Sequence, residues 1–231
     1  MRRVVAFVFV AAVIAAVPAS AQDKKVDVNI GGGYTFAISE IRKHLGDGYN
    51  VNFGLTFHVT PLIGIQAEYS FNGMGKKQVN LDVSNTPGGA TTSQPFYGDM
   101  NMQYGDFNLV IKPPTEGKIK PYIVAGAGVY YRPVKVTTPS VGYIPGYCDP
   151  WWYWCYPGGF VPIDKIVGSR STTGLGIDVG GGVTAWVHES VAIYIEARYH
   201  YIWGPDIKDS TGMSHGKANG QFLPITVGLR F

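Results

Sequence analysis

The chain has 231 residues, with 19 Lys and Arg against 16 Asp and Glu, 31 Gly, 15 Pro and 2 Cys. Charged residues make up 15%, well below the roughly 25% of an average soluble domain. Two cysteines are too few for a disulfide-stapled mini-protein or a four-thiolate zinc site. The formal net charge of +3 falls to +1 without Arg2 and Arg3, which gives no electrostatic case for nucleic-acid binding.

The first 21 residues have the pattern of a secretory signal peptide. Arg2 and Arg3 precede an uninterrupted apolar run at 4–17, and small residues lead to a cleavage site after Ala21. The run is shorter than the about 20 residues that a membrane-spanning helix needs. We therefore predict a signal peptide at 1–21 and a mature chain at 22–231 outside the cytoplasm.

From residue 26 onwards, apolar and polar residues alternate with period two, which predicts β-strands. Around Glu68, for example, Ile65, Ala67, Tyr69 and Phe71 alternate with polar residues. A tilted strand of about 9–11 residues crosses a bilayer, and each run is long enough. The predicted strands are 26–36, 49–59, 63–72, 100–112, 120–134, 174–187, 191–203 and 223–231.

The connections between these runs alternate in length. Short connections are predicted at 61–62, 113–119 and 188–190, whereas long loops are predicted at 37–48, 73–99, 135–173 and 205–220. An up-and-down meander with all its short turns at one end produces this alternation, and outer-membrane barrels have that asymmetry. A soluble eight-stranded barrel of the lipocalin type is the main structural alternative.

The distribution of glycine decides between these two barrels. Gly126, Gly128, Gly176, Gly180 and Gly182 lie in the polar rows, opposite the bulky aliphatic rows. A narrow barrel interior favours small residues, whereas glycine on an outer strand surface only costs stability. Aromatic residues gather towards the strand ends, as in the girdles at lipid headgroups. We predict an all-β fold, an eight-stranded antiparallel up-and-down transmembrane β-barrel with apolar rows facing lipid.

The signal peptide, the eight alternating strands and the final Val227-Gly228-Leu229-Arg230-Phe231 resemble the OmpA/OmpX-type outer-membrane β-barrels. The resemblance covers 26–231. It implies a location in the bacterial outer membrane, lipid as the surrounding partner, and recognition of the terminal Phe231 by the barrel-assembly machinery. It does not imply cell-wall tethering, because we find no peptidoglycan-binding segment in the sequence after the barrel.

The polar rows place charged residues inside the predicted barrel, together with His58 and His200. Charges withdrawn from water persist only when they are paired and hydrogen-bonded. These side chains either plug the bore, which the small size of an eight-stranded barrel favours, or form a gated path for ions or small solutes. The predicted lumen network comprises Asp27, Glu68, Asp106, Asp178, Glu196, Lys112, Arg132, Arg198 and Arg230.

No motif points to catalysis. The sequence lacks G-x-S-x-G, H-E-x-x-H and P-loop patterns, and His188-Glu189 has no second histidine four positions on. We therefore expect no enzyme, no cofactor and no metal site, with an enzyme at the loop-side rim as a remaining alternative.

The segment 143–160, in the longest predicted loop, has eight aromatic residues among 18. We predict a disulfide between Cys148 and Cys155, because the exported chain meets an oxidising compartment. Rigid rings there suit a surface partner protein or a glycan, although the loop could instead form its own apolar cluster over the barrel mouth. The predicted function is non-enzymatic, structural and surface-interacting, with a narrow pore as the alternative. The residues predicted to make the interaction are Trp151, Trp152, Tyr153 and Trp154.

Overall fold

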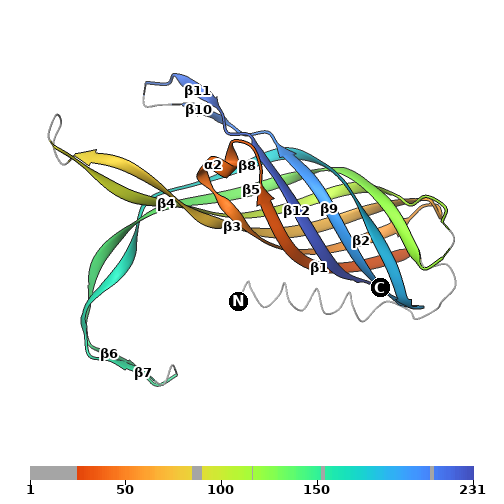
Figure 1. Ribbon diagram of the computed structural model, residues 1–231, viewed down its shortest axis with the longest axis horizontal. Helices are drawn as coiled ribbons and strands as arrows, with labels where there is room; N and C mark the ends of the chain where they lie inside the picture. Colours follow the sequence, from red (N-terminus) through yellow and green to blue (C-terminus); the bar gives the residue numbers. More distant parts are fainter. Residues whose placement is uncertain (1–24, 85–89, 116, 152–153, 209–210) are drawn as a thin grey trace.

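The computed structural model describes residues 25–84, 90–115, 117–151, 154–208 and 211–231, so the predicted signal peptide lies outside the described residues. Eight antiparallel strands close into a barrel in the order β1-β12-β9-β8-β5-β4-β3-β2 (Figure 1). Each strand pairs with its neighbours along the chain, and the first closes on the last, which confirms the predicted eight-stranded up-and-down barrel. The strands are β1 (Val26–Ala37), β2 (Gly46–His58), β3 (Ile63–Ser84), β4 (Thr91–Ile111), β5 (Ile119–Ile144), β8 (Gly159–His188), β9 (Val191–Ile202) and β12 (Gly220–Arg230).

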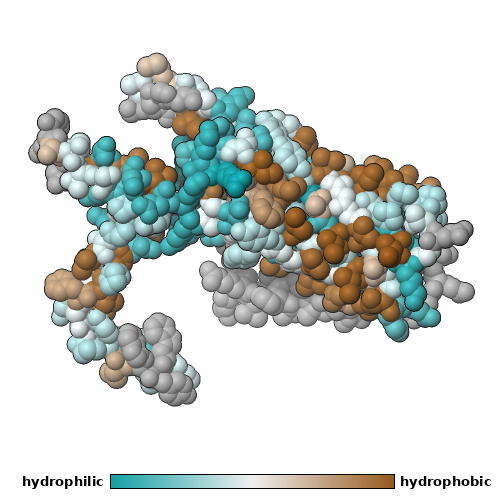
Figure 2. Space-filling view, in the orientation of Figure 1, coloured by the Kyte–Doolittle hydropathy of each residue, from teal (hydrophilic) through white to brown (hydrophobic). Residues whose placement is uncertain are grey.

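The side chains alternate between the two faces of the wall as predicted. On β3, Ile65 is 49% exposed and Gln66 only 1%, and on β9 Ile195 is 55% exposed and Glu196 only 5%. On the face seen in Figure 2, the broadest hydrophobic area lies on the barrel, away from the end where the long hairpins leave it, and smaller hydrophobic patches lie on the hairpins. A water-soluble protein rarely exposes so continuous an apolar surface, whereas a membrane protein needs it to contact acyl chains.

The structure corrects the prediction that 73–99 and 135–173 are loops. Strands β3 and β4 continue beyond the wall to Ser84 and Thr91, and β5 and β8 continue to Ile144 and Gly159. Each extended pair forms a two-stranded ribbon that projects from the barrel (Figure 1). The β3–β4 arm comprises 76–84 and 91–96. The β5–β8 arm comprises 138–151 and 154–166 and includes β6 (Tyr147–Asp149) and β7 (Trp154–Tyr156).

The two remaining long connections also contain regular secondary structure. The first contains α2 (Ile41–His44), and Leu45 after it packs in a buried cluster with Ala37, Met74 and Met100 at the base of the arms. The second contains the small hairpin β10 (Asp206–Lys208) and β11 (Ser214–Lys217). Across the described residues, no helix is long and apolar enough to cross a membrane.

Candidate functional site

The centre of the barrel holds four carboxylates around one guanidinium. Arg198 donates from Nε to Glu196 Oε1 at 3.0 Å, and its Nη1 lies 3.4 Å from Glu68 Oε1. The same Nη1 lies 3.5 Å from Asp106 Oδ2 and 3.6 Å from Asp178 Oδ1, which is close enough for charge attraction but long for a hydrogen bond. All five side chains are buried. They form the central cluster, which carries four acidic groups and one basic group.

Strand register brings these residues to one level of the bore. Glu68 on β3 is the direct cross-strand partner of Asp106 on β4, and Arg198 on β9 is the partner of Gly180 on β8. A Cβ at Gly180 would lie 2.7 Å from the Cα of Arg198 and 2.9 Å from its Cγ. Only glycine therefore leaves room for the arginine stem at this position, as the glycine-rich polar rows predicted.

The structure separates the other predicted network members from the central cluster. At the short-turn end, Asp27 Oδ2 lies 3.1 Å from Lys112 Nζ and 2.8 Å from His58 Nε2. Arg230 donates to Thr184 and lies over two tyrosine rings. Towards the arms, Arg132 Nη1 donates to the carbonyl of Ala218 at 3.1 Å. The predicted single network is thus divided into groups. Tyr122 connects two of them, because Arg230 lies over its ring and its hydroxyl donates to Glu196 Oε2 at 2.9 Å.

A layer of rings fills the bore beside the central cluster, and of its members only His200 was predicted to lie in the bore. Tyr104 stacks on Tyr130 at a centroid distance of 4.8 Å, and His200 stacks on Phe222 at 4.5 Å. With Met102 and Ile202 these side chains form the ring layer, whose members are at most 4% exposed. The alternation of inward- and outward-facing positions could have placed Tyr104 in the bore, because it lies two residues before the inward-facing Asp106. Side chains rather than water occupy this level of the bore.

The tip of the β5–β8 arm is closed by the predicted disulfide. Cys148 and Cys155 are cross-strand partners of β6 and β7, with their Cα atoms 4.1 Å apart. Trp151 follows in the turn with 88% of its surface exposed, and its backbone N–H donates to Asp149 Oδ1 at 2.8 Å. Trp152 and Tyr153 lie outside the described residues, and of Trp154 only the backbone pairing in β7 is described.

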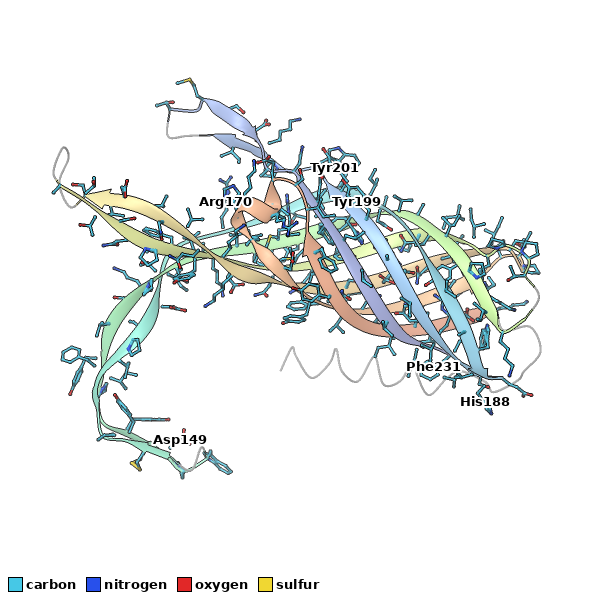
Figure 3. All side chains as sticks on the ribbon, viewed as in Figure 1. Asp149, Arg170, His188, Tyr199, Tyr201 and Phe231 are labelled. Atoms are coloured by element: carbon cyan, nitrogen blue, oxygen red, sulfur yellow. A yellow bond between two sulfur atoms is a disulfide. The ribbon has the colours of Figure 1, made fainter. Side chains whose placement is uncertain are left out.

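Lower on the same arm, Tyr143 and Phe160 form an exposed edge-to-face pair with centroids 5.4 Å apart. The described rings Tyr143 and Phe160 therefore do not fold back over the barrel mouth, as the alternative supposed for this loop, but stand on a ribbon that projects from it (Figure 1). In Figure 3, Asp149 lies at the arm tip, whereas Tyr199 and Tyr201 lie on β9 near the rim from which the arms leave.

Phe231 lies at the opposite end of the barrel, near His188 (Figure 3). Its backbone pairs with Val28 of β1 through hydrogen bonds of 2.9 and 3.1 Å, and 39% of its surface is exposed. Its recognition by the barrel-assembly machinery stays a prediction.

A closed eight-stranded wall with an aliphatic outer surface and a polar interior defines an integral outer-membrane β-barrel protein. The chain belongs to the family described as outer membrane protein beta-barrel domain, whose model matches residues 7–231. The protein is accordingly located in the bacterial outer membrane. Its sequence has no significant match among curated proteins.

Three solved outer-membrane structures are similar in fold. Neisserial surface protein A is 14% identical, with 90% of this chain and 96% of that chain covered and a TM-score of 0.49. A major outer membrane protein of Thermus thermophilus is 10% identical, with 90% and 99% covered and a TM-score of 0.49. The attachment invasion locus protein Ail of Yersinia pestis, in complex with the heparin analogue sucrose octasulfate, is 13% identical, with 90% and 100% covered and a TM-score of 0.42.

Proposed function

We propose that the protein is a non-enzymatic surface-interaction protein, in which the membrane barrel holds the β5–β8 arm outside the cell for contact with a protein or glycan. The observation that carries this proposal is that β5 and β8 stay paired beyond the wall, with one register shift between Val136 and Thr137, as far as Ile144 and Gly159 below the β6–β7 tip. The register runs from Ile119 opposite Ala185 to Ile144 opposite Gly159. A flexible loop loses conformational entropy on binding, and a ribbon that is already ordered avoids part of that cost.

The composition of the arm supports the same role. Val141, Tyr143 and Phe160 are each more than 60% exposed, although an isolated soluble ribbon gains nothing from exposing them. Exposed aromatic side chains are enriched where proteins bind, because they bury a large area with few rotatable bonds. The disulfide fixes the tip that carries Trp151.

The filled bore supports an anchoring role for the barrel over a pore. Met102, Tyr130, Ile202 and Phe222 are each 0% exposed, so solvent does not reach the ring layer. Water-filled channels are typical of barrels of 16–18 strands, which are much wider. We therefore expect small, rare conductance steps or none in planar bilayers. Large, steady open channels would contradict the proposal and favour the pore alternative.

The test exchanges the tip tryptophans for serine in one variant, Trp151→Ser with Trp152→Ser and Trp154→Ser. A matched control replaces Val79 and Leu81, exposed apolar residues of the β3–β4 arm, with serine. Expressing cells are assayed on arrays of immobilised proteins and glycans, with heat-modifiable migration of the extracted barrel as a folding check. We expect the tip variant to lose binding by at least about tenfold, as removal of a binding hot spot does, and the control to retain it. Equal binding by the tip variant and the wild type would refute the proposal.

A further inference from the structure

The ring layer and the central cluster meet at a group of ligand-type atoms that the proposed function does not use. One carboxylate oxygen of Asp106, one of Asp178 and one ring nitrogen of His200 all lie within 4.8 Å of one another. Asp178 and His200 are direct cross-strand partners of β8 and β9, so both side chains enter the bore at the same level. All three residues are buried, with exposures of 2%, 4% and 0%.

Four polar atoms of this group have no hydrogen-bond partner among the described residues, whereas Asp106 Oδ1 accepts from Asn108 and His200 Nδ1 contacts Tyr130. Both oxygens of Asp178, Oδ2 of Asp106 and Nε2 of His200 accept or donate no hydrogen bond among the described residues, although the two carboxylates feel the charge of Arg198. Asp106 Oδ2 and Asp178 Oδ1 lie 3.5 and 3.6 Å from Arg198 Nη1, which has no hydrogen-bond partner in the described part of the chain either. Buried polar atoms are nearly always hydrogen-bonded, so this group of atoms calls for a ligand. The histidine is also oriented, because its Nδ1 lies 2.9 Å from the Tyr130 hydroxyl, leaving Nε2 for another partner. Metal-binding histidines are typically held in this way through their second nitrogen.

The charge of the central cluster points to the sign of that ligand. Glu68, Asp106, Asp178 and Glu196 surround Arg198 alone, whereas Arg230 is engaged with Thr184 and two tyrosine rings. Excess negative charge in a dry interior is costly, and a divalent cation offsets it. Two carboxylates and an imidazole are hard-to-intermediate ligands that suit Zn²⁺ or a neighbouring first-row ion.

We propose that Asp106, Asp178 and His200 bind one divalent transition-metal ion inside the barrel, with Zn²⁺ as the ion to test, and that the ion locks β4, β8 and β9 at this level. Ligand bonds of about 2.1 Å put tetrahedral ligand atoms about 3.4 Å apart, so the three side chains close slightly around the ion. We expected no metal from the sequence, because the three ligands lie on three strands and share no spacing motif. Only the register of the closed barrel brings them together.

The full mature chain is refolded from urea into detergent with ZnCl₂ or with EDTA, desalted, and analysed for bound zinc by mass spectrometry. We expect about one Zn²⁺ per wild-type chain refolded with zinc. The His200→Gln variant is expected to lose at least nine-tenths of this zinc. His58→Gln, which alters the other described histidine of the bore, is the matched control and should bind as the wild type does. Wild-type chain that folds with zinc present but retains none would overturn the proposal.

A stability measurement keeps the proposal testable if His200→Gln does not fold. Asp178→Asn removes one excess negative charge, which should stabilise the protein without metal, and one metal ligand, which should weaken the stabilisation by zinc. Its effect on the urea midpoint should therefore have opposite signs in EDTA and in zinc. The variant should unfold at higher urea than the wild type in EDTA and at lower urea in zinc. If the carboxylates are instead neutralised by protons, zinc shifts neither midpoint, and the proposal is wrong.

Discussion

The barrel and the β5–β8 arm use the same alternation of side chains in opposite surroundings. In the barrel each strand has a partner on both sides, one face meets lipid and the other faces the bore. In the arm, β5 and β8 have only each other, so both faces meet water and apolar rings such as those of Tyr143 and Phe160 stay exposed. The comparison teaches that strand pattern sets the backbone, whereas the number of neighbouring strands decides whether a side chain becomes core or contact surface.

The largest effect is expected where the barrel closes. A Cβ at Gly33 on β1 would collide with the carbonyl oxygen of Ile225 on β12, which is backbone and has no rotamer to change. This clash should keep β1 from pairing with β12 in the Gly33→Ala variant. The open wall would then leave unpaired backbone groups in lipid, so the variant should not fold into a barrel. Gly32→Ala is the control, since its Cβ would meet only the carbonyl oxygen of Asn50 at 3.3 Å. Gel migration without boiling should show a folded barrel for Gly32→Ala and none for Gly33→Ala.

The next largest loss of stability is expected on replacing Arg198, which supplies the only guanidinium of the central cluster. Arg198→Met leaves four buried carboxylates without their cation, and breaking a buried ion pair costs about 3–5 kcal/mol. Arg170→Met removes an exposed arginine from β8 where it leaves the barrel and should cost nothing measurable. Urea titrations of both variants in EDTA measure the two losses of stability, one from the central cluster and one from the part of β8 that leaves the barrel. Equal stability of the two variants would show that the cluster does not depend on Arg198.

A local effect is expected at the arm tip. The double variant Cys148→Ser with Cys155→Ser opens the short loop between β6 and β7, which should destabilise the tip by about 2.5 kcal/mol on the chain-entropy model. Hydrogen exchange should rise at 147–156 and stay unchanged in β9 and β12. Faster exchange in the barrel strands would show that the two regions are coupled.

The smallest effect is expected between the two arms. Lys76 Nζ lies 3.0 Å from Asp164 Oδ2, but both side chains are about half exposed. Solvent and salt screen such a pair, so Lys76→Ala should leave the urea midpoint of the barrel unchanged. A clear loss of barrel stability in this variant would mean that the arms brace the wall.

The barrel wall could be predicted from the sequence because each of its strands has to satisfy two constant environments, lipid and bore. The β3–β4 arm could not, because Gly73, Gly75 and the Lys76–Lys77 pair interrupt the alternation, and its strand structure depends on a hairpin partner. Strand propensity follows such neighbours more than it follows the segment itself.

For the residues of the site, the sequence predicts which face of the wall a side chain occupies but not its height along the barrel axis. The period-two alternation places Glu68, Asp106 and Arg198 on the inner face, and the structure confirms that they are buried there. The alternation along a strand does not give the height of a residue along the barrel axis, because that height depends on the stagger of eight tilted strands. For that reason Asp27 and Arg132 belong to the same inner rows but lie apart from the central cluster, and the approach of His200 to Asp178 could not be anticipated.

The continuity of β5 and β8 has a mechanical consequence. With 30 residues at about 3.3 Å each, β8 is a single strand of about 100 Å from turn to arm. A pull on the tip acts along β5 and β8, across the hydrogen bonds that join them to β4 and β9. Those bonds carry the load together in shear and do not open one after another. A cell tethered by this ribbon would transmit tension along β5 and β8 into its membrane wall.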